Sequence, residues 1–513
     1  MDSSKIKIII VAISASFAAL YLGITAATAQ FETLAWTLGA SLFVTCLLLG
    51  RRVFLLIPLM TSLGLTLPLP GSFTTGFIFQ IIVLAFLSAL FLMRRLPMRP
   101  GFTELEAWCL LLLLTVLQTY MRNPIGLSLF GSDSVGAKPY VVFGLSTLSA
   151  LVLSLLLIDP KDFKLWVYLS FTGSILNFLV GSIGWIFPQT SYVLGASFST
   201  DINRDSEAGQ ATRISFVRNI SVALATWISS RISPLRACFH PLWLPLVLAA
   251  FAFAGLSGFR SQLIMVGTIL FIGVCYRGGF KSVLASSIIG VGGLVFLAFV
   301  NLIAPLPLNI QRSLTFLPGT WDSSLKDSAD DSTEWRVEMW KEALLTDRWI
   351  ANKWLGDGLG FTKAEHERML ALSEGEVEGY RGSSGLTNQQ ENMMISGGYH
   401  SGPVQTIRTT GYVGLAILLM AMIRLAVHAH RQILRCRGTE WFPTAIFLGA
   451  PMIATPFLWT FVFGNFDTGA SGVMLGSALL RMMENNLPLS SFVIGDRKPY
   501  ILRRQSTLSG STG

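Results

Sequence analysis

Long apolar runs alternate with short polar linkers along most of the chain, and this pattern predicts membrane-spanning helices. The strict apolar–polar alternation that marks membrane β-strands is not seen. Each run of about 17–25 apolar residues can cross a bilayer, so we expect an all-α polytopic membrane protein with about 12–14 transmembrane helices. The predicted spans lie near residues 8–26, 34–50, 53–70, 75–93, 104–121, 139–158, 163–187, 214–230, 238–257, 261–276, 282–304, 408–428, 441–463 and 468–483.

A single long polar segment, residues 305–407, interrupts this pattern before the last spans, and we call it the insert. The chain then divides into N-terminal helices (1–212), central helices (213–304), the insert, C-terminal helices (408–484) and a polar tail (485–513) that we expect to be disordered. The first run also resembles a signal peptide. We interpret it as an uncleaved span, because many further spans follow it.

Charge sets the orientation of this array in the membrane. Of the 513 residues, 52% are hydrophobic and 13% are charged, against about 25% charged residues in soluble proteins. The net charge of +9 does not indicate nucleic-acid binding, since the basic residues lie in short loops between spans. With the spans above, every basic cluster falls on the same side, which predicts cytoplasmic termini and a periplasmic insert. These clusters are Lys5 and Lys7; Arg51 and Arg52; Arg94, Arg95 and Arg99; Lys161 and Lys164; Arg231 and Arg236; Arg277 and Lys281; Arg431, Arg435 and Arg437; and Arg497, Lys498, Arg503 and Arg504.

Within the insert the sequence predicts one amphipathic helix, a tight turn and a mobile loop. Capping residues at Asp331–Glu334 predict the start of a helix over 335–356, which can lie in the membrane interface or pack over the bundle. Gly356-Asp-Gly-Leu-Gly360 follows no strand, so we interpret it as a turn rather than a phosphate cradle. Residues 373–398 are rich in Gly, Ser, Glu and Asn and predict a mobile loop.

The candidate chemical groups are one histidine and several arginines on the side of the insert. His400 immediately precedes a predicted span, where a neutral imidazole is suited to act as a general base. Arginine is disfavoured on the outer side, and its guanidinium binds phosphate oxygens in a bidentate fork. The alternative is that each arginine pairs with an acid of the insert or with a lipid headgroup. The arginines on this side are Arg213, Arg218, Arg260, Arg336 and Arg408.

The sequence gives no indication of a metal or redox site. His366 and His400 are the only histidines of the insert, too few ligands for zinc, and none of the five cysteines lies in it. We therefore predict no disulfide framework, no metal and no cofactor.

Four stretches resemble the O-antigen ligase and O-antigen polymerase family of bacterial membrane proteins. The first is His400-Ser-Gly-Pro-Val-Gln-Thr-Ile-Arg-Thr-Thr-Gly411-Tyr-Val-Gly414, where a histidine precedes a Gly-x-x-Gly that opens the next span. Ser257-Gly-Phe-Arg260-Ser, Arg336 with Trp340, and the Gly356–Gly360 turn are similar to further family features in the same order. The stretch Arg213–Arg218 is similar only weakly.

The resemblance implies an inverting glycosyltransferase at the periplasmic face of the bacterial inner membrane. Its donor would be a glycan on undecaprenyl diphosphate, and its acceptor lipid A-core or another glycan. His400 would take the proton of the acceptor hydroxyl. Arg260 and Arg336, with Arg213, Arg218 and Arg408, would hold the diphosphate. Ligase and polymerase stay equally open, since both share donor and chemistry.

The competing interpretation is a transporter, such as a lipid-linked oligosaccharide flippase, and a third is a non-catalytic assembly or sensor component. The single late insert and the lack of an internal repeat argue against transport. Few ionisable residues lie at mid-span, where ion-coupled transporters place them, and the exceptions Arg218 and Arg424 lie near an interface.

Overall fold

The computed structural model of the chain describes residues 31–65, 74–99, 101–125, 136–187, 214–374 and 388–487. The predicted first span, Arg213 and most of the C-terminal tail lie outside these residues. The described chain contains helices and isolated bridges but no strand, so the prediction of an all-α polytopic membrane protein is confirmed. The helices are α2 (Phe31–Leu49), the 3₁₀ helix η1 (Gly50–Leu55), α3 (Leu56–Leu63), α4 (Thr75–Leu92), α5 (Glu104–Arg122), α6 (Lys138–Ser154), α7 (Pro160–Ile186), α9 (Ser215–Arg231), α10 (Pro234–Ala237), α11 (Leu244–Leu256), α12 (Arg260–Arg277), α13 (Phe280–Ile303), α14 (Leu308–Leu314), α15 (Ser323–Leu345), α16 (Lys363–Glu374), α18 (Asn388–Ser396), α19 (Gly402–Cys436), α20 (Phe442–Phe461) and α21 (Phe466–Asn486).

Seven segments of the described chain are long and apolar enough to cross a membrane, judged by length and composition alone. Two shorter apolar helices, α6 and α11, accompany them. The total of 12–14 spans stays a prediction, because residues 1–30 are not described. The seven segments are Gly39–Leu63, Thr75–Leu92, Glu104–Arg122, Pro160–Ile186, Phe280–Ile303, Gly402–Cys436 and Phe442–Phe461.

The predicted span over 53–70 is wrong. The structure has η1 followed by α3, which ends at Leu63 because Gly64 adopts a left-handed conformation with φ +60°. The next described helix, α4, begins beside the end of α3, where the Thr75 hydroxyl donates a 3.1 Å hydrogen bond to the Met60 carbonyl. An apolar run does not reveal such an early helix end, since the residues after Gly64 remain apolar.

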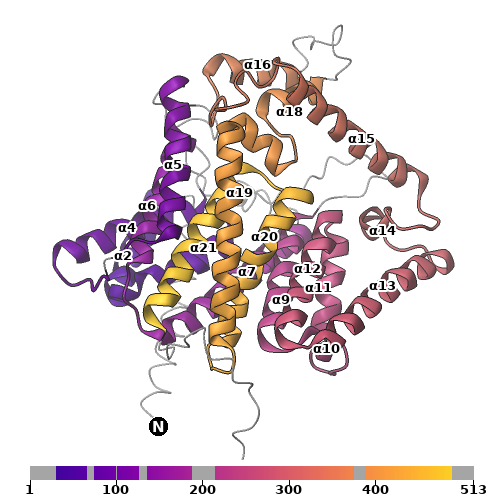
Figure 1. The fold of residues 1–513 in the computed structure, drawn as a ribbon, viewed down its shortest axis with the longest axis horizontal. Coiled ribbons are helices and arrows are strands. Elements are labelled where there is room, and N and C mark those ends of the chain that lie inside the picture. The colour runs from indigo at the N-terminus through magenta and orange to yellow at the C-terminus, as the bar shows by residue number, and fades with distance from the viewer. Residues whose placement is uncertain are drawn as a thin grey trace, which may run out of the picture.

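Helix α19 runs through the middle of the molecule and organises the bundle (Figure 1). It packs against α5, α20 and α21, and α20 packs in turn against α9 and α12. A large apolar core lies among α5, α19, α20 and α21, and a smaller one lies among α9, α11 and α12. Helix α13 extends away from the bundle at the lower right of Figure 1, and its most apolar stretch has no buried residue.

Basic residues gather at one end of the bundle, which we call the basic end. Arg52 forms an ion pair of 3.0 Å with Asp162, at the start of α7. Lys164 lies two residues further along α7 and forms a 2.6 Å ion pair with Glu440, just before α20. Six of the predicted basic clusters lie in the described part of the chain. Contacts made by their residues, or by the helix ends next to them, place all six at this end. The insert covers the opposite end, which we call the loop end (Figure 1).

Two ion pairs, one of them buried, join α5 to α19 and α21 near the basic end. Glu106 of α5 accepts a 2.9 Å bond from Arg481 of α21, and the side chains of both are almost fully buried. Glu104 of α5 pairs with Arg424 of α19, so Arg424 has an acidic partner rather than lying free at an interface. A charge in a low-dielectric interior is tolerated when it is paired in this way. These pairs could not be predicted from the sequence, because the two partners of each pair lie more than three hundred residues apart.

Candidate functional site

The insert returns to the bundle through α14, beside the start of α12. The Ser313 hydroxyl donates a 3.0 Å hydrogen bond to the Gly255 carbonyl, and the Asn309 amide donates one of 3.3 Å to the Leu256 carbonyl. Both carbonyls belong to the end of α11, a few residues before Arg260. Since α14 also contacts α12 and α15, it connects the start of α15 to this end of the bundle.

Helix α15 begins earlier and ends earlier than the sequence predicted. Asp322 caps it, accepting bonds of 3.0 and 3.4 Å from the Ser324 and Leu325 amides, so the predicted start at Asp331–Glu334 is wrong. Hydrogen bonds from Ser324 hold the pKa of the Asp322 carboxyl below its ordinary value. The helix ends at Leu345 rather than continuing to residue 356, and the chain after it forms turns.

Helix α15 packs over the bundle, which was one of the two interpretations of its apolar face. Met339 and Ala343 are fully buried against the segment that carries His400, in a small core of their own. The Trp340 indole donates a 2.7 Å hydrogen bond to the Tyr399 carbonyl. Arg336 lies one helical turn before Trp340 and so lies on the same face of α15. The structure therefore joins the Arg336–Trp340 stretch to the residue directly before His400.

His400 has an unusual backbone conformation. Its φ is +49°, in the left-handed region that non-glycine residues rarely adopt. The preceding Tyr399 side chain is completely buried, and its hydroxyl donates a 3.2 Å bond to the Met394 carbonyl. Burial raises the pKa of Tyr399 to about 12, so it stays protonated at neutral pH. The His400 ring is half-buried and lies 6.1 Å, centroid to centroid, from the Phe463 ring at the end of α20.

The start of α19 fixes His400 from the other side. The Ser401 hydroxyl caps this helix by accepting from the Val404 amide. Gly402 packs so closely on the Trp459 indole that a Cβ would overlap it. Gln405 accepts a 3.1 Å bond from the Phe466 amide, which ties the helix to the start of α21. The helix therefore begins at residue 402 rather than 408, and His400 lies at its N-terminus.

A break divides α19 at Gly411, and the Gly356–Gly360 turn fills it. Gly411 has φ +74° and ψ −177°, so the helical hydrogen bonds stop there. The backbone of the turn replaces them, since the Asp357 amide donates to the Arg408 carbonyl at 2.6 Å and the Gly358 amide to the Thr409 carbonyl at 3.0 Å. The tight turn predicted here is confirmed by the left-handed glycines of this segment.

The same turn is bound to the loop end of α5 and α6. Arg122 donates to the Leu355 and Gly356 carbonyls at 2.9 and 2.5 Å. The Leu359 amide donates a 2.9 Å bond to the Tyr140 hydroxyl. The Gly-rich turn therefore has a structural role, because it holds the His400-bearing part of α19 against the bundle. Sequence analysis missed Arg122, whose position at the end of a span gave no sign of this contact.

Arg218 and Arg260 form a second group at the loop end. The Arg218 guanidinium lies 5.8 Å from the centre of the Phe259 ring, and Phe259 directly precedes Arg260. The buried Gln262 side chain donates a 3.0 Å bond to the Arg218 carbonyl and so locks α12 to α9. The structure thus brings these two predicted arginines together on neighbouring helices.

Arg408 lies on α19, and its side chain contacts the insert. Its guanidinium donates a 3.2 Å bond to the Ile395 carbonyl and lies 4.8 Å from the centre of the Phe361 ring. The side chain is nearly buried and also packs against Gly397. These contacts order the segment before His400, and a role for Arg408 in diphosphate binding stays a prediction.

Part of the segment predicted to be a mobile loop over 373–398 is helical, which corrects that prediction. Residues 388–396 form α18, and the Glu391 side chain is fully buried in a 2.8 Å ion pair with Arg368 of α16. Met394 of the same helix is also fully buried, beneath Tyr399. The polar composition concealed this helix, because its burial depends on partners elsewhere in the insert.

Residues 244–419 match the model of the O-antigen ligase family. This match covers about a third of the chain and supports an assignment to the O-antigen ligase and polymerase family. The matched region runs from α11 to the part of α19 just beyond its break. It includes Arg260, Arg336, His400 and Arg408, and it excludes Arg218. No curated protein matches the sequence. The family supports a glycosyltransferase of ligase or polymerase type in polysaccharide biosynthesis.

The loop end thus combines a fixed imidazole with cationic side chains from three helices. His400 is held by the Trp340–Tyr399 bond and the start of α19. Arg336 comes from α15, Arg260 from α12 and Arg218 from α9. In general, a proton acceptor can deprotonate a hydroxyl while guanidinium groups stabilise a departing anion.

Proposed function

We propose that the protein is an inverting glycosyltransferase that transfers a glycan from undecaprenyl diphosphate to a lipid or saccharide acceptor. The basic end would face the cytoplasm and the loop end the periplasm, in the bacterial inner membrane, following the positive-inside rule. The observation that carries the proposal is His400, a histidine in a left-handed conformation at a helix start, within the matched family region and anchored by Trp340.

The proposed reaction is a single displacement at the anomeric carbon. The acceptor hydroxyl oxygen attacks this carbon and forms the new glycosidic bond, while the bond from the carbon to the diphosphate oxygen breaks. The bonding electron pair leaves with the diphosphate, and His400 accepts the hydroxyl proton. Arg260 and Arg336 stabilise the departing charge, with Arg218 beside Arg260 as a further contact. Attack opposite to the leaving group inverts the anomeric configuration.

The test is transfer by the purified chain in liposomes that contain a labelled glycan on undecaprenyl diphosphate and an acceptor. Arg260→Ala and Arg336→Ala are each expected to lower the transfer rate by about 10²–10³-fold, the usual loss when one charge-stabilising donor is removed. His400→Ala should also abolish most transfer. Since no step uses a divalent cation, we expect EDTA to leave the rate unchanged.

The matched control is Arg51→Ala, an exposed arginine at the basic end whose loss should leave the rate unchanged. Equal rates in the wild type and the Arg260 and Arg336 variants, at equal protein levels, would contradict the proposed diphosphate site. The product that accumulates in a deletion strain distinguishes the two acceptor classes. Single lipid-linked repeats indicate a lost polymerase, and long lipid-linked chains indicate a lost ligase.

A further inference from the structure

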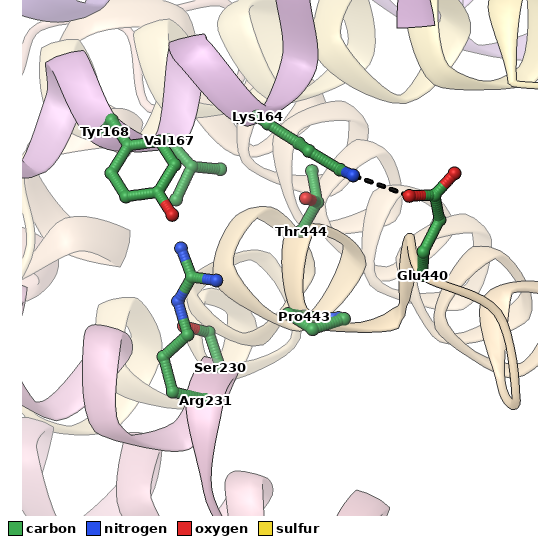
Figure 2. A pocket seen from close by; sticks show the side chains of 8 residues that line it. All are labelled: Lys164, Val167, Tyr168, Ser230, Arg231, Glu440, Pro443 and Thr444. Carbon is green, nitrogen blue, oxygen red and sulfur yellow. Dashed lines mark hydrogen bonds and ion pairs between the residues drawn. The ribbon is translucent and has the colours of Figure 1, made fainter. Parts of the chain in front are cut away.

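A small cavity of about 200 Å³ opens at the basic end, far from the proposed site. It lies between α7, the end of α9 and the start of α20 (Figure 2). Lys164 and Arg231 line it from two different helices, and Glu440 is the one carboxylate among its lining residues. The volume is below the roughly 300–1,000 Å³ of sites for drug-sized ligands, so it suits a small charged group.

The charges of this cavity do not balance. Glu440 is taken by Lys164, with a 2.6 Å separation between the amine and the carboxylate. Arg231 forms no ion pair in the described chain, and its Nε is buried without a hydrogen-bond acceptor. Arg277 adds a third cation at the border, because its Nε donates a 2.7 Å bond to the Ser229 carbonyl next to the cavity. A buried donor without an acceptor is destabilising, which favours an anion in this space.

Aromatic side chains hold the Arg231 guanidinium in place. It lies 4.4 Å from the centre of the Trp227 ring and 5.1 Å from that of Tyr168. These contacts orient the guanidinium but leave its charge uncompensated. Trp and Tyr are enriched at the membrane–water interface, so this pair places the cavity at the depth of lipid headgroups.

We propose that this cavity binds the headgroup phosphate of an anionic phospholipid from the leaflet at the basic end. Basic pockets between transmembrane helices are suited to such headgroups. The apolar surface beside the cavity favours a lipid over free phosphate, because Leu165 and Tyr168 are 41% and 48% exposed and would lie along the acyl chains. The phosphate oxygens would accept bonds from Arg231 and Lys164.

The test is native mass spectrometry of the full-length chain, incubated in detergent with phosphatidylglycerol or phosphatidylcholine. We expect the wild type to retain phosphatidylglycerol preferentially. Arg231→Gln should lower its affinity about fivefold, which corresponds to about 1 kcal/mol for one basic residue near an anionic headgroup. Arg231→Lys, which keeps the charge, should retain most of the binding.

The matched control is Arg95→Gln, an exposed basic residue that does not line the cavity, and its binding should equal that of the wild type. If Arg231→Gln does not fold, Lys164→Gln supplies the same comparison and should weaken binding at least as much, since it leaves Glu440 unpaired in the cavity. Equal retention of the two lipids, or undiminished binding in the folded cavity variants, would overturn the proposal. If inorganic phosphate displaced phosphatidylglycerol, the cavity would be a site for free phosphate, and the proposal of a lipid headgroup would be wrong.

Discussion

His400 is the residue on which the proposed chemistry depends, and its backbone conformation is energetically unfavourable. A left-handed conformation costs a residue with a side chain roughly 1–2 kcal/mol relative to glycine. The fold maintains it through Trp340, which bonds to the Tyr399 carbonyl, and through the capped start of α19. Strain of this kind gathers at functional sites. The position would be more stable with glycine, so the imidazole is retained for another reason.

Comparing His400→Ala with His400→Gly tests this strain directly. Both variants remove the imidazole, but only glycine adopts φ near +49° without a steric cost. We therefore expect His400→Gly to be more stable than His400→Ala by about 1 kcal/mol. Thermal unfolding of the purified variants in detergent measures the difference. An alanine variant as stable as the glycine variant would show that the position is not strained.

The position of a residue relative to the spans could be predicted from the sequence, but its contacts could not. His400 was recognised from its place before a span and from its family resemblance. The bond between Trp340 and Tyr399 joins residues 59 positions apart, which no local pattern reveals. Arg408 was grouped with the phosphate ligands on charge alone, but its guanidinium contacts the Ile395 carbonyl and the Phe361 ring.

At the scale of elements, the break in α19 is the feature that positions the site. The short helix before Gly411 carries His400 at its start, and the longer helix after it belongs to the bundle. The Gly356–Gly360 turn joins them by bonding to the carbonyls that the break exposes. Gly356 must lack a side chain, because a Cβ would lie 2.5 Å from the Thr409 carbonyl oxygen.

Gly411→Ala should therefore disrupt the site. A Cβ at residue 411 would overlap the Trp354 carbonyl, and alanine at φ +74° is strained as well. We expect at least a tenfold loss of transfer with the protein still inserted in the membrane. Gly438→Ala is the matched control, since Gly438 has φ +81° but open space around its Cβ position. Equal activity of the two variants would indicate that docking of the turn does not matter.

The sequence could not predict this break. The residues directly before Gly411 are mostly polar, so the predicted span begins near residue 408 and the helix before the break is missed. A glycine within a helical pattern is usually tolerated without a break, and only the distant turn shows that this one is different. For the same reason the predicted start of α15 was late. Asp322 is a good capping residue, but it precedes a polar stretch without helical periodicity.

At the scale of the whole molecule, the two ends of the bundle differ in chemistry. One carries the basic clusters and their ion pairs, and the other carries the insert with His400. The pattern of spans and short basic loops was sufficient to predict this difference between the two ends. Basic clusters recur after every second predicted span, so they all fall at the same end. They were not sufficient to fix the number of spans, as α3 shows by ending at Leu63.

Cysteine labelling tests the orientation of the ends. Glu367 in α16 and Glu440 before α20 are surface residues, with side chains 63% and 66% exposed. In intact spheroplasts, a membrane-impermeant maleimide should label Glu367→Cys and leave Glu440→Cys unlabelled until lysis. The wild type, which carries five free cysteines, gives the background. Labelling of Glu440→Cys in intact spheroplasts would reverse the proposed topology.

The central claim is that His400 removes the acceptor proton during glycan transfer at the loop end. Asn tolerates the left-handed conformation, so His400→Asn keeps the backbone and loses the base. The decisive measurement is the single-turnover rate at which liposomes containing this variant release undecaprenyl diphosphate. We predict a rate about 10²–10⁴-fold below that of the wild type, the usual contribution of a general base. A rate within about threefold of the wild type would contradict the claim.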